Sequence, residues 1–244
     1  MWLVLLAAIF VPLERLGAVR PHRLFRKQIL TDLRYYFLGG LVLPLLLVLP
    51  VAAIVWMLHG VVPGDVLALA VGLPLWVRLP ATLVAGEIGF YWGHRWTHEI
   101  PLLWRFHAIH HSAEQLDWLV NTRSHPLDLM FTRICGFIPL YLLGLALPMA
   151  GPAAQLPLLI VLVGPAWGFF VHANLRWRFG WFEWLIATPA FHHWHHPGTT
   201  MSTRTTPPCS PGSTASSAPI TCRATNGPAA TAPAPRFRPI WAAS

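Results

Sequence analysis

Ten of the 13 histidines fall in five short groups, and these groups hold the side chains best suited to chemistry. The groups are His94 and His98; His107, His110 and His111; His125; His172; and His192, His195 and His196. A neutral imidazole is the commonest protein ligand for a transition metal. Because a tetrahedral zinc ion takes only four ligands, this many histidines favours two metal ions held close together.

The spacing inside the groups suits helices that direct several rings to one place. His94 and His98 are four residues apart, so on a helix their rings share one face. The pattern His-x-x-His-His occurs twice, at residues 107–111 and 192–196. His193 falls between the ligand candidates of the second copy and points elsewhere on a helix, so we expect it to orient ligands without binding metal.

The scarcity of carboxylates narrows the kind of metal site. The chain has nine acidic residues, and it lacks the Glu-x-x-His pairs that carboxylate-bridged bundles use. A zinc protease of the His-Glu-x-x-His type is excluded, because His98-Glu99 has no second histidine at the required place. The site must therefore consist mostly of imidazole, a ligand that suits iron, zinc, copper and nickel alike.

The composition is typical of a membrane protein. The chain is 55% hydrophobic and 11% charged, whereas soluble domains carry about 25% charged residues. The net charge of +8 comes from arginines and lysines that lie between apolar runs, so membrane topology explains it better than nucleic-acid binding. The three cysteines show no disulfide framework and no zinc-finger spacing.

Long apolar runs predict an all-α integral membrane protein with about four to five transmembrane or membrane-embedded helices. Residues 1–13 are shorter than the ~20 residues of a span and predict an anchoring helix. The other runs are 36–58, 66–92, which Arg78 divides, and then 134–149 and 156–171, which a Gly-Pro turn at Gly151-Pro152 joins into a hairpin.

The basic residues orient these helices. Arginines and one lysine crowd residues 15–34, and the positive-inside rule places that connection in the cytoplasm. Alternating crossings then put the loops at residues 93–133 and 172–196, which are also rich in arginine, on the same side. All five histidine groups are thus expected on the cytoplasmic face. This shared location favours metal binding by His125 and His172, which a lone histidine would not suggest.

The histidine groups lie within longer stretches that resemble a known family. They read Tyr-Trp-Gly-His-Arg-Trp-Thr-His (91–98), Phe-His-Ala-Ile-His-His-Ser (106–112), Arg-Ser-His-Pro (123–126), His-Ala-Asn (172–174) and Thr-Pro-Ala-Phe-His-His-Trp-His-His (188–196). In this order and spacing they resemble the sterol desaturase / fatty acid hydroxylase superfamily. The resemblance extends from about Glu14 to His196.

This resemblance implies a membrane oxygenase that activates dioxygen and attacks an unactivated C–H bond of a membrane lipid. It implies that the ten grouped histidines hold two iron ions, for which zinc can substitute. Fatty acyl, sterol, carotenoid and ether-lipid substrates all fit, as do hydroxylation and desaturation. The chain has no nucleotide motif, so a separate electron-transfer protein is expected as external donor. Four polar residues close to the ligands are expected to orient imidazoles: Asp117, Asn121, Arg123 and Asn174.

Two other functions fit the histidines less well. A His-liganded zinc enzyme of the membrane uses fewer ligands and keeps a carboxylate base nearby. A non-catalytic metal-binding carrier needs ligands inside the spans, where only ungrouped polar residues occur. Anaerobic conversion of substrate would favour the zinc enzyme, and metal uptake by vesicles would favour the carrier.

Three regions are expected along the chain. Residues 1–92 form the N-terminal membrane helices, 93–198 the His-rich catalytic region with the membrane hairpin 134–171, and 199–244 a tail of disordered composition. The superfamily usually continues after the last histidines with Asn-Tyr and then Trp-x-Asp-x-Leu-Phe-Gly-Thr. If the codons of the tail are read in a shifted frame that starts at their third base, the shifted frame can encode these residues. We therefore predict a frameshift near Pro197–Thr199.

Overall fold

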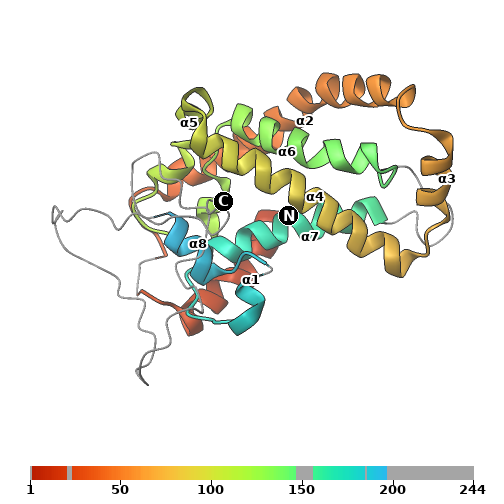
Figure 1. The fold of residues 1–244 in the computed structure, drawn as a ribbon. Helices are drawn as coiled ribbons and strands as arrows, with labels where there is room; N and C mark the ends of the chain where they lie inside the picture. The colour runs from red at the N-terminus through yellow and green to blue at the C-terminus, as the bar shows by residue number, and fades with distance from the viewer. Residues whose placement is uncertain (1, 21–23, 147–155, 185, 197–244) are drawn as a thin grey trace, which may run out of the picture. The chain divides into compact units, whose positions relative to one another are not determined.

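The computed structural model describes residues 2–20, 24–146, 156–184 and 186–196, all within one unit, Met1–Pro207. These residues form helices and loops and contain no β-strand, so the predicted all-α class is confirmed for the described part of the chain (Figure 1). The elements are α1 (Trp2–Gly17), α2 (Ile29–His59), α3 (Gly64–Gly72), α4 (Leu75–Glu99), α5 (Pro101–His107), η1 (His110–Ser112), η2 (Trp118–Thr122), α6 (Pro126–Leu142), α7 (Leu156–His172), η4 (Gly180–Trp184) and α8 (Pro189–His195). The predicted tail 199–244 and the turn at Gly151-Pro152 lie outside the described residues.

α2 is the described helix that is long and apolar enough to cross a membrane, over Ile29–Met57. It covers nearly all of the predicted span 36–58. Large apolar side chains along it are exposed, among them Phe37, Leu49 and Trp56. Such a surface has no favourable partner in water and is expected of a helix surrounded by lipid.

The run predicted as a single span at 66–92 is instead two helices, α3 and α4, bent by 119°. The break falls at Leu73 and Pro74, which both have extended backbone. Proline disfavours the helical region for the residue before it and lacks the N–H that a continuous helix needs. The described residues therefore contain one candidate span, or two if the bent pair counts as one, which leaves the predicted four to five untested.

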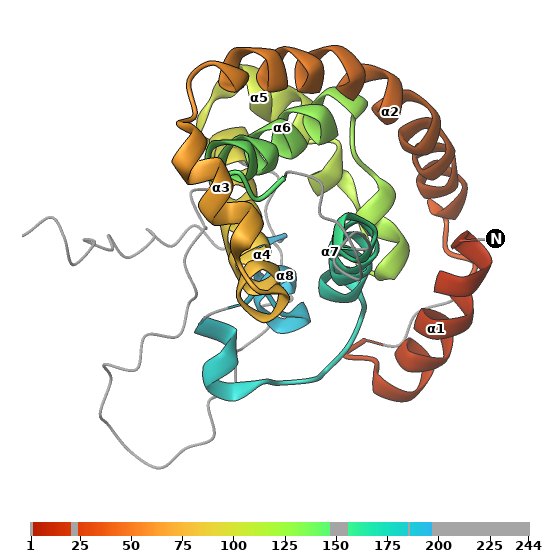
Figure 2. The same ribbon diagram turned by 90° about the vertical axis from the view of Figure 1, so that its right-hand side faces the viewer.

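Small residues let α4 and α6 approach closely. A Cβ placed on Gly93 of α4 would lie 2.7 Å from Cβ of Cys135 on α6, a distance that real side chains do not reach. Figure 2 shows α2 running alongside α6 on its outer side, in agreement with their contacts. Since α4 ends in two of the histidine candidates, this packing fixes where they stand relative to α6.

α1 holds together the two loops that lead to the remaining histidines. Phe10 of α1 stacks on Trp118 of η2, with ring centroids 6.0 Å apart. The buried carboxylate of Glu14 accepts hydrogen bonds from the backbone N–H groups of Trp118 and Asn174, each at 2.8 Å. One side chain thus fixes both η2 and the segment that follows His172.

Candidate metal centre

Eight of the ten grouped histidines gather into two sets of four. The first set, with one nitrogen from each ring, consists of His94, His98, His107 and His195. The second set consists of His110, His172, His192 and His196. Within each set the candidate ligand atoms all lie within 4.8 Å of one another. Each set therefore offers the four imidazole nitrogens that one metal ion can take.

Both sets draw on elements that are distant in sequence. In the first, Nε2 of His94 lies 3.0 Å from Nε2 of His195, 101 residues away, and Nε2 of His107 lies 3.1 Å from Nε2 of His98. α4 supplies His94 and His98 one turn apart, as the spacing predicts. α5 and α8 add one ring each.

The second set forms a chain of close Nε2 atoms. His172 lies 3.0 Å from His110 and 2.8 Å from His192, and His192 lies 2.9 Å from His196, all between Nε2 atoms. Nitrogens bound to one ion at 2.0–2.1 Å stand about 3.0 to 3.4 Å apart, depending on the coordination angle. The spacing between these atoms is therefore close to that of ligands around a shared ion.

The Nδ1 atoms of His110 and His172 show that the contact between these two rings is not an ordinary hydrogen bond. Nδ1 of His110 lies 3.2 Å from the carbonyl of Arg123, and Nδ1 of His172 lies 2.7 Å from the carbonyl of Gly168. Because a carbonyl only accepts, each Nδ1 carries the proton. A neutral ring then has only a lone pair at Nε2. Two lone pairs facing each other at 3.0 Å repel, unless a cation lies between them.

In the first set, Asp128 fixes the proton of one ring, His107. Its carboxylate oxygens lie 3.1 and 3.2 Å from Nδ1 of His107 and accept that proton. Nε2 of His107 is left with its lone pair toward His98. Nδ1 of His98 is buried and has no hydrogen-bond partner among the described residues. Such an orphaned nitrogen beside three other imidazoles fits a site built for a metal.

The environment keeps these imidazoles neutral. Burial first, and then the neighbouring imidazoles, lower the pKa of His110 well below its ordinary value. The same two causes lower the pKa of His192 and of His196. Only a deprotonated nitrogen can bind a metal, so the electrostatics hold the rings in the form that a metal requires.

His111 lies between the two sets. Its ring centroid is 5.0 Å from that of His195 in the first set and 4.5 Å from that of His196 in the second. Nε2 of His111 is buried and has no hydrogen-bond partner within the described residues. The ring is thus a ninth candidate ligand.

Besides His111, two other histidines of the prediction lie outside both sets, His125 and His193. His125 occupies the N-cap of α6, where its Nδ1 accepts the backbone N–H of Leu127 at 3.2 Å. Its ring packs against Phe106, with centroids 4.8 Å apart. His193 lies with Nε2 3.1 Å from the carbonyl of His172, to which it donates.

The four polar residues predicted to orient imidazoles make different contacts. The carbonyl of Arg123 accepts the Nδ1 proton of His110. Asn121 packs against Gly168, because a Cβ added to Gly168 would lie 2.9 Å from Oδ1 of Asn121. Asp117 caps η2 by accepting from Leu119 N–H at 3.0 Å. The side chain of Asn174 donates to the carbonyl of Arg20 and accepts from its N–H.

Sequence reasoning missed Asp128 and Glu14. Asp128 is one of nine acidic residues and lies in the first turn of an apolar helix, and this position was the available signal. A carboxylate on an apolar helix needs a partner, and metal-bound histidines commonly donate to carboxylates. Glu14 gives the same indication, because it is a carboxylate within the apolar helix α1.

Comparisons with known proteins identify the family of this chain. Residues 79–203, just over half of the chain, match the model of the family described as fatty acid hydroxylase. The ornithine lipid hydroxylase OlsE of Rhizobium tropici is 41% identical over 124 residues, which cover 50% of this chain and 35% of that protein.

More distant relatives are also lipid monooxygenases by name. The alkylglycerol monooxygenase of Homo sapiens is 28% identical over 110 residues, 45% of this chain and 23% of that protein. The methylsterol monooxygenase 2-2 of Arabidopsis thaliana is 29% identical over 139 residues, 51% of this chain and 46% of that protein. The chain thus spans less than half the length of these three relatives. No solved structure matches it. With the family model covering both His-x-x-His-His patterns, the resemblance is confirmed, and the chain belongs to the fatty acid hydroxylase family.

Proposed function

We propose that this protein holds one iron ion in each four-histidine set and hydroxylates a membrane lipid with dioxygen. The observation that carries the proposal is the meeting of the Nε2 lone pairs of His110 and His172 in the second set, where two backbone carbonyls fix the proton positions. In the first set, Asp128 likewise directs the Nε2 lone pair of His107 toward the other imidazoles. The relatives named above are hydroxylases and monooxygenases of lipids, which supports hydroxylation over a metal-carrier role.

The ions, the groups that orient the imidazoles and the burial of the rings each have a separate role in this reaction. When bound, the ions would supply the reduction of dioxygen and the removal of hydrogen from a C–H bond. Asp128 and the carbonyls of Arg123 and Gly168 hold three imidazoles with Nε2 toward the ions. Burial of most of the rings keeps water from the centre.

The same proposal places the centre at the cytoplasmic surface of a membrane. α2 provides a span, and its exposed apolar side chains contact lipid. The basic residues around 15–34 mark the cytoplasmic side by the positive-inside rule. A lipid chain in that leaflet can then reach the histidines, and a separate electron-transfer protein can reach them from the cytoplasm.

The test combines metal analysis with substrate conversion. We expect the detergent-purified protein to hold about two iron ions per chain. His98→Ala should remove the ion of the first set and His172→Ala that of the second. Arg178→Gln is the control, because that side chain is exposed and should leave the metal content unchanged. One zinc ion per chain, or no stoichiometric metal, would contradict the proposal.

Substrate conversion is measured on lipids of the classes that the relatives' names give. The ornithine lipid comes first, because its hydroxylase is 41% identical over the matched residues. An alkylglycerol and a methylsterol are the comparison substrates. We expect incorporation of one oxygen atom from labelled dioxygen, with a reductant and a donor protein supplied. Conversion that proceeds equally well without dioxygen would exclude an oxygenase.

A further inference from the structure

Four charged side chains form a buried network between the start of α2 and the loop before α6. They are Arg26, Asp32, Asp117 and Arg123, and their exposed fractions are 7%, 0%, 5% and 2%. Two positive and two negative groups balance one another. A buried charge is tolerated only when it is paired and hydrogen-bonded, so each member depends on the others.

The contacts run in a continuous line. Arg26 donates to both oxygens of Asp117, at 2.5 Å from Nε and 2.8 Å from Nη2, and also contacts Asp32. Oδ1 of Asp32 accepts from Nε of Arg123 at 2.5 Å. Asp32, on α2, is therefore the link between the two arginines.

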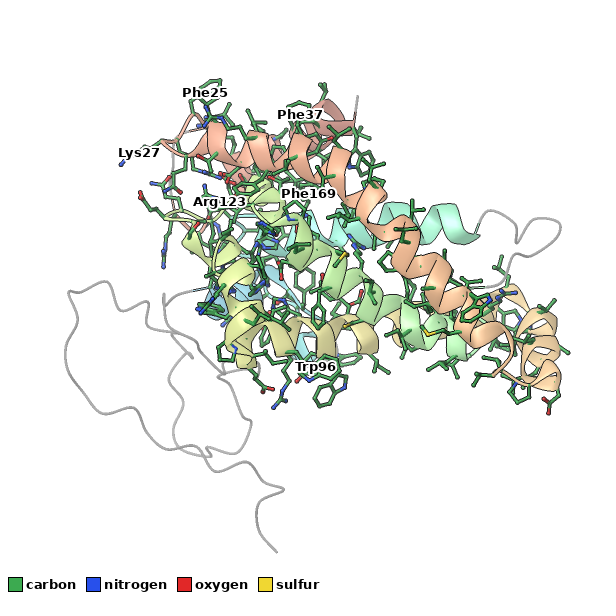
Figure 3. All side chains as sticks on the ribbon, turned by 90° about the horizontal axis from the view of Figure 1, so that it is seen from above. Phe25, Lys27, Phe37, Trp96, Arg123 and Phe169 are labelled. Carbon is green, nitrogen blue, oxygen red and sulfur yellow. The ribbon has the colours of Figure 1, made fainter. Side chains whose placement is uncertain are left out.

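Arg123 is held from several sides, and its own carbonyl orients a candidate ligand. Besides Asp32, its guanidinium donates to Oε1 of Gln28 at 2.7 Å. The hydroxyl of the preceding Thr122 donates to the carbonyl of Asp32 at 2.8 Å. Figure 3 shows Arg123 beside the first turns of α2, on the same side as Lys27. The carbonyl of Arg123 then accepts the proton from Nδ1 of His110.

We infer that Asp32 is a positioning residue for the second metal ion, acting through Arg123 on His110. The inference rests on the proposed function, because it assumes that the second set holds an ion. The first set has a different support, since its His107 is oriented by Asp128 of α6. The two ions should therefore respond differently to a change at Asp32.

Loss of the Asp32 charge has a definite structural consequence. In Asp32→Asn, Arg123 and Arg26 stay charged and buried with one counter-charge fewer. Without this ion pair, we expect the guanidinium of Arg123 to turn toward water or toward Asp117, and the backbone of Arg123 to shift with it. The proton acceptor of His110 moves away, and Nε2 loses its fixed direction toward the second ion.

The experiment titrates the metal-free full-length protein with Co²⁺ and follows its visible absorption. The variants are Asp32→Asn, Asp32→Glu and the exposed control Arg178→Gln. To assign the ions, Asp32→Asn is combined with His98→Ala, which leaves only the second set, and with His172→Ala, which leaves only the first.

We expect Asp32→Asn to weaken Co²⁺ binding about 10- to 100-fold in the His98→Ala background. In the His172→Ala background the affinity should stay within about twofold of its value without the Asp32 change. Asp32→Glu should recover part of the affinity, since the carboxylate is kept. If Asp32→Asn fails to fold, Arg123→Lys, which keeps the charge but loses the guanidinium fork, should give the same selective loss.

Two results would overturn the inference: equal weakening in both backgrounds, or none in either. A wild-type chain that binds Co²⁺ at both sets yet hydroxylates no lipid when loaded with iron would overturn the proposed function alone. Changes in stability are followed separately by thermal unfolding. A purely structural role would lower the melting temperature without selecting one ion.

Discussion

The carboxylate of Asp128 lies 3.1 Å from Nδ1 of His107, while Nε2 of the same ring lies 3.1 Å from Nε2 of His98. One imidazole thus joins a carboxylate on α6 to the end of α4. A carboxylate that accepts the Nδ1 proton makes the other nitrogen a better electron donor. Asp128 therefore both orients His107 and strengthens it as a ligand.

The first prediction concerns this carboxylate. Asp128→Asn should weaken metal binding at the first set about 10- to 100-fold, because a neutral amide oxygen is a poorer acceptor for the His107 proton. Binding at the second set should not change. Metal titration checks this, with Asp65→Asn as control because Asp65 is an exposed carboxylate at the start of α3. Equal affinity in Asp128→Asn and the unchanged protein would refute it.

The second prediction concerns His125, which the family resemblance implies as a ligand. In the structure its Nδ1 caps α6, at Leu127 N–H. Loss of a helix N-cap costs about 0.5 to 2 kcal/mol. We therefore expect His125→Ala to lower the free energy of unfolding by about 0.5 to 2 kcal/mol. The variant should retain both metal ions. Loss of one ion with unchanged stability would instead make His125 a ligand.

The third prediction tests the close packing of α4 on α6. A methyl group at Gly93 would meet Cβ of Cys135, so Gly93→Ala must push the helices apart. Such overpacking costs about 1 to 3 kcal/mol and should also displace His94. We expect lower thermal stability together with weaker metal binding at the first set. Gly40→Ala is the control, since nothing lies within 4 Å of that position; a similar effect of both changes would speak against close packing as the cause.

The fourth prediction follows from the lowered pKa values. In the metal-free folded protein, burial lowers the pKa of His110, His192 and His196 well below the ordinary value near 6.5. The unfolded chain takes up these protons at higher pH than the folded chain does. These groups therefore cost the folded state no stability well above pH 6.5, and the free energy of unfolding decreases as the pH falls below about 6.5. Thermal unfolding of the chelator-treated protein should show this decrease, with a shallower slope in His110→Asn; a melting temperature that rises on acidification would contradict it.

The fifth prediction concerns the tail, which lies outside the described residues. The match to the fatty acid hydroxylase family ends at residue 203, shortly after the proposed frameshift near Pro197–Thr199. The DNA across these codons should show that a one-base shift restores Asn-Tyr and then Trp-x-Asp-x-Leu-Phe-Gly-Thr. An immediate stop codon in the shifted frame would exclude this. If the shift is present, the restored chain should bind metal more tightly than the chain with the present tail.

Local spacing predicted much of the centre, since it depends on helix geometry. His94 and His98 lie one turn apart and join the same set, as an α-helix dictates. The break at Leu73 and Pro74 was also accessible from sequence, because proline restricts the residue before it. The 66–92 run was nevertheless interpreted as one span, because its apolar length outweighed that signal.

The sequence could not predict how the candidate ligands are divided between the two sets. Within one His-x-x-His-His pattern, His107 joins the first set and His110 the second. This division depends on contacts with α7 and α8. His172 of α7, for example, lies 62 residues after its neighbour His110 in the chain. Asp32 was likewise out of reach, because its partner Arg123 is 91 residues distant. Pairing over such separations is set by tertiary packing, which no local pattern records.

α8 has a consequence for how the protein matures. It is the last described helix, and with the residue that follows it contributes to both sets: His195 to the first, His192 and His196 to the second. During synthesis the helices up to α7 emerge while both sets still lack members. Neither set is complete until the ribosome has released the segment around residue 196 and it has folded back against α4 and α7. Under the proposed function, metal loading is therefore a late event that follows the synthesis of α2, the candidate span.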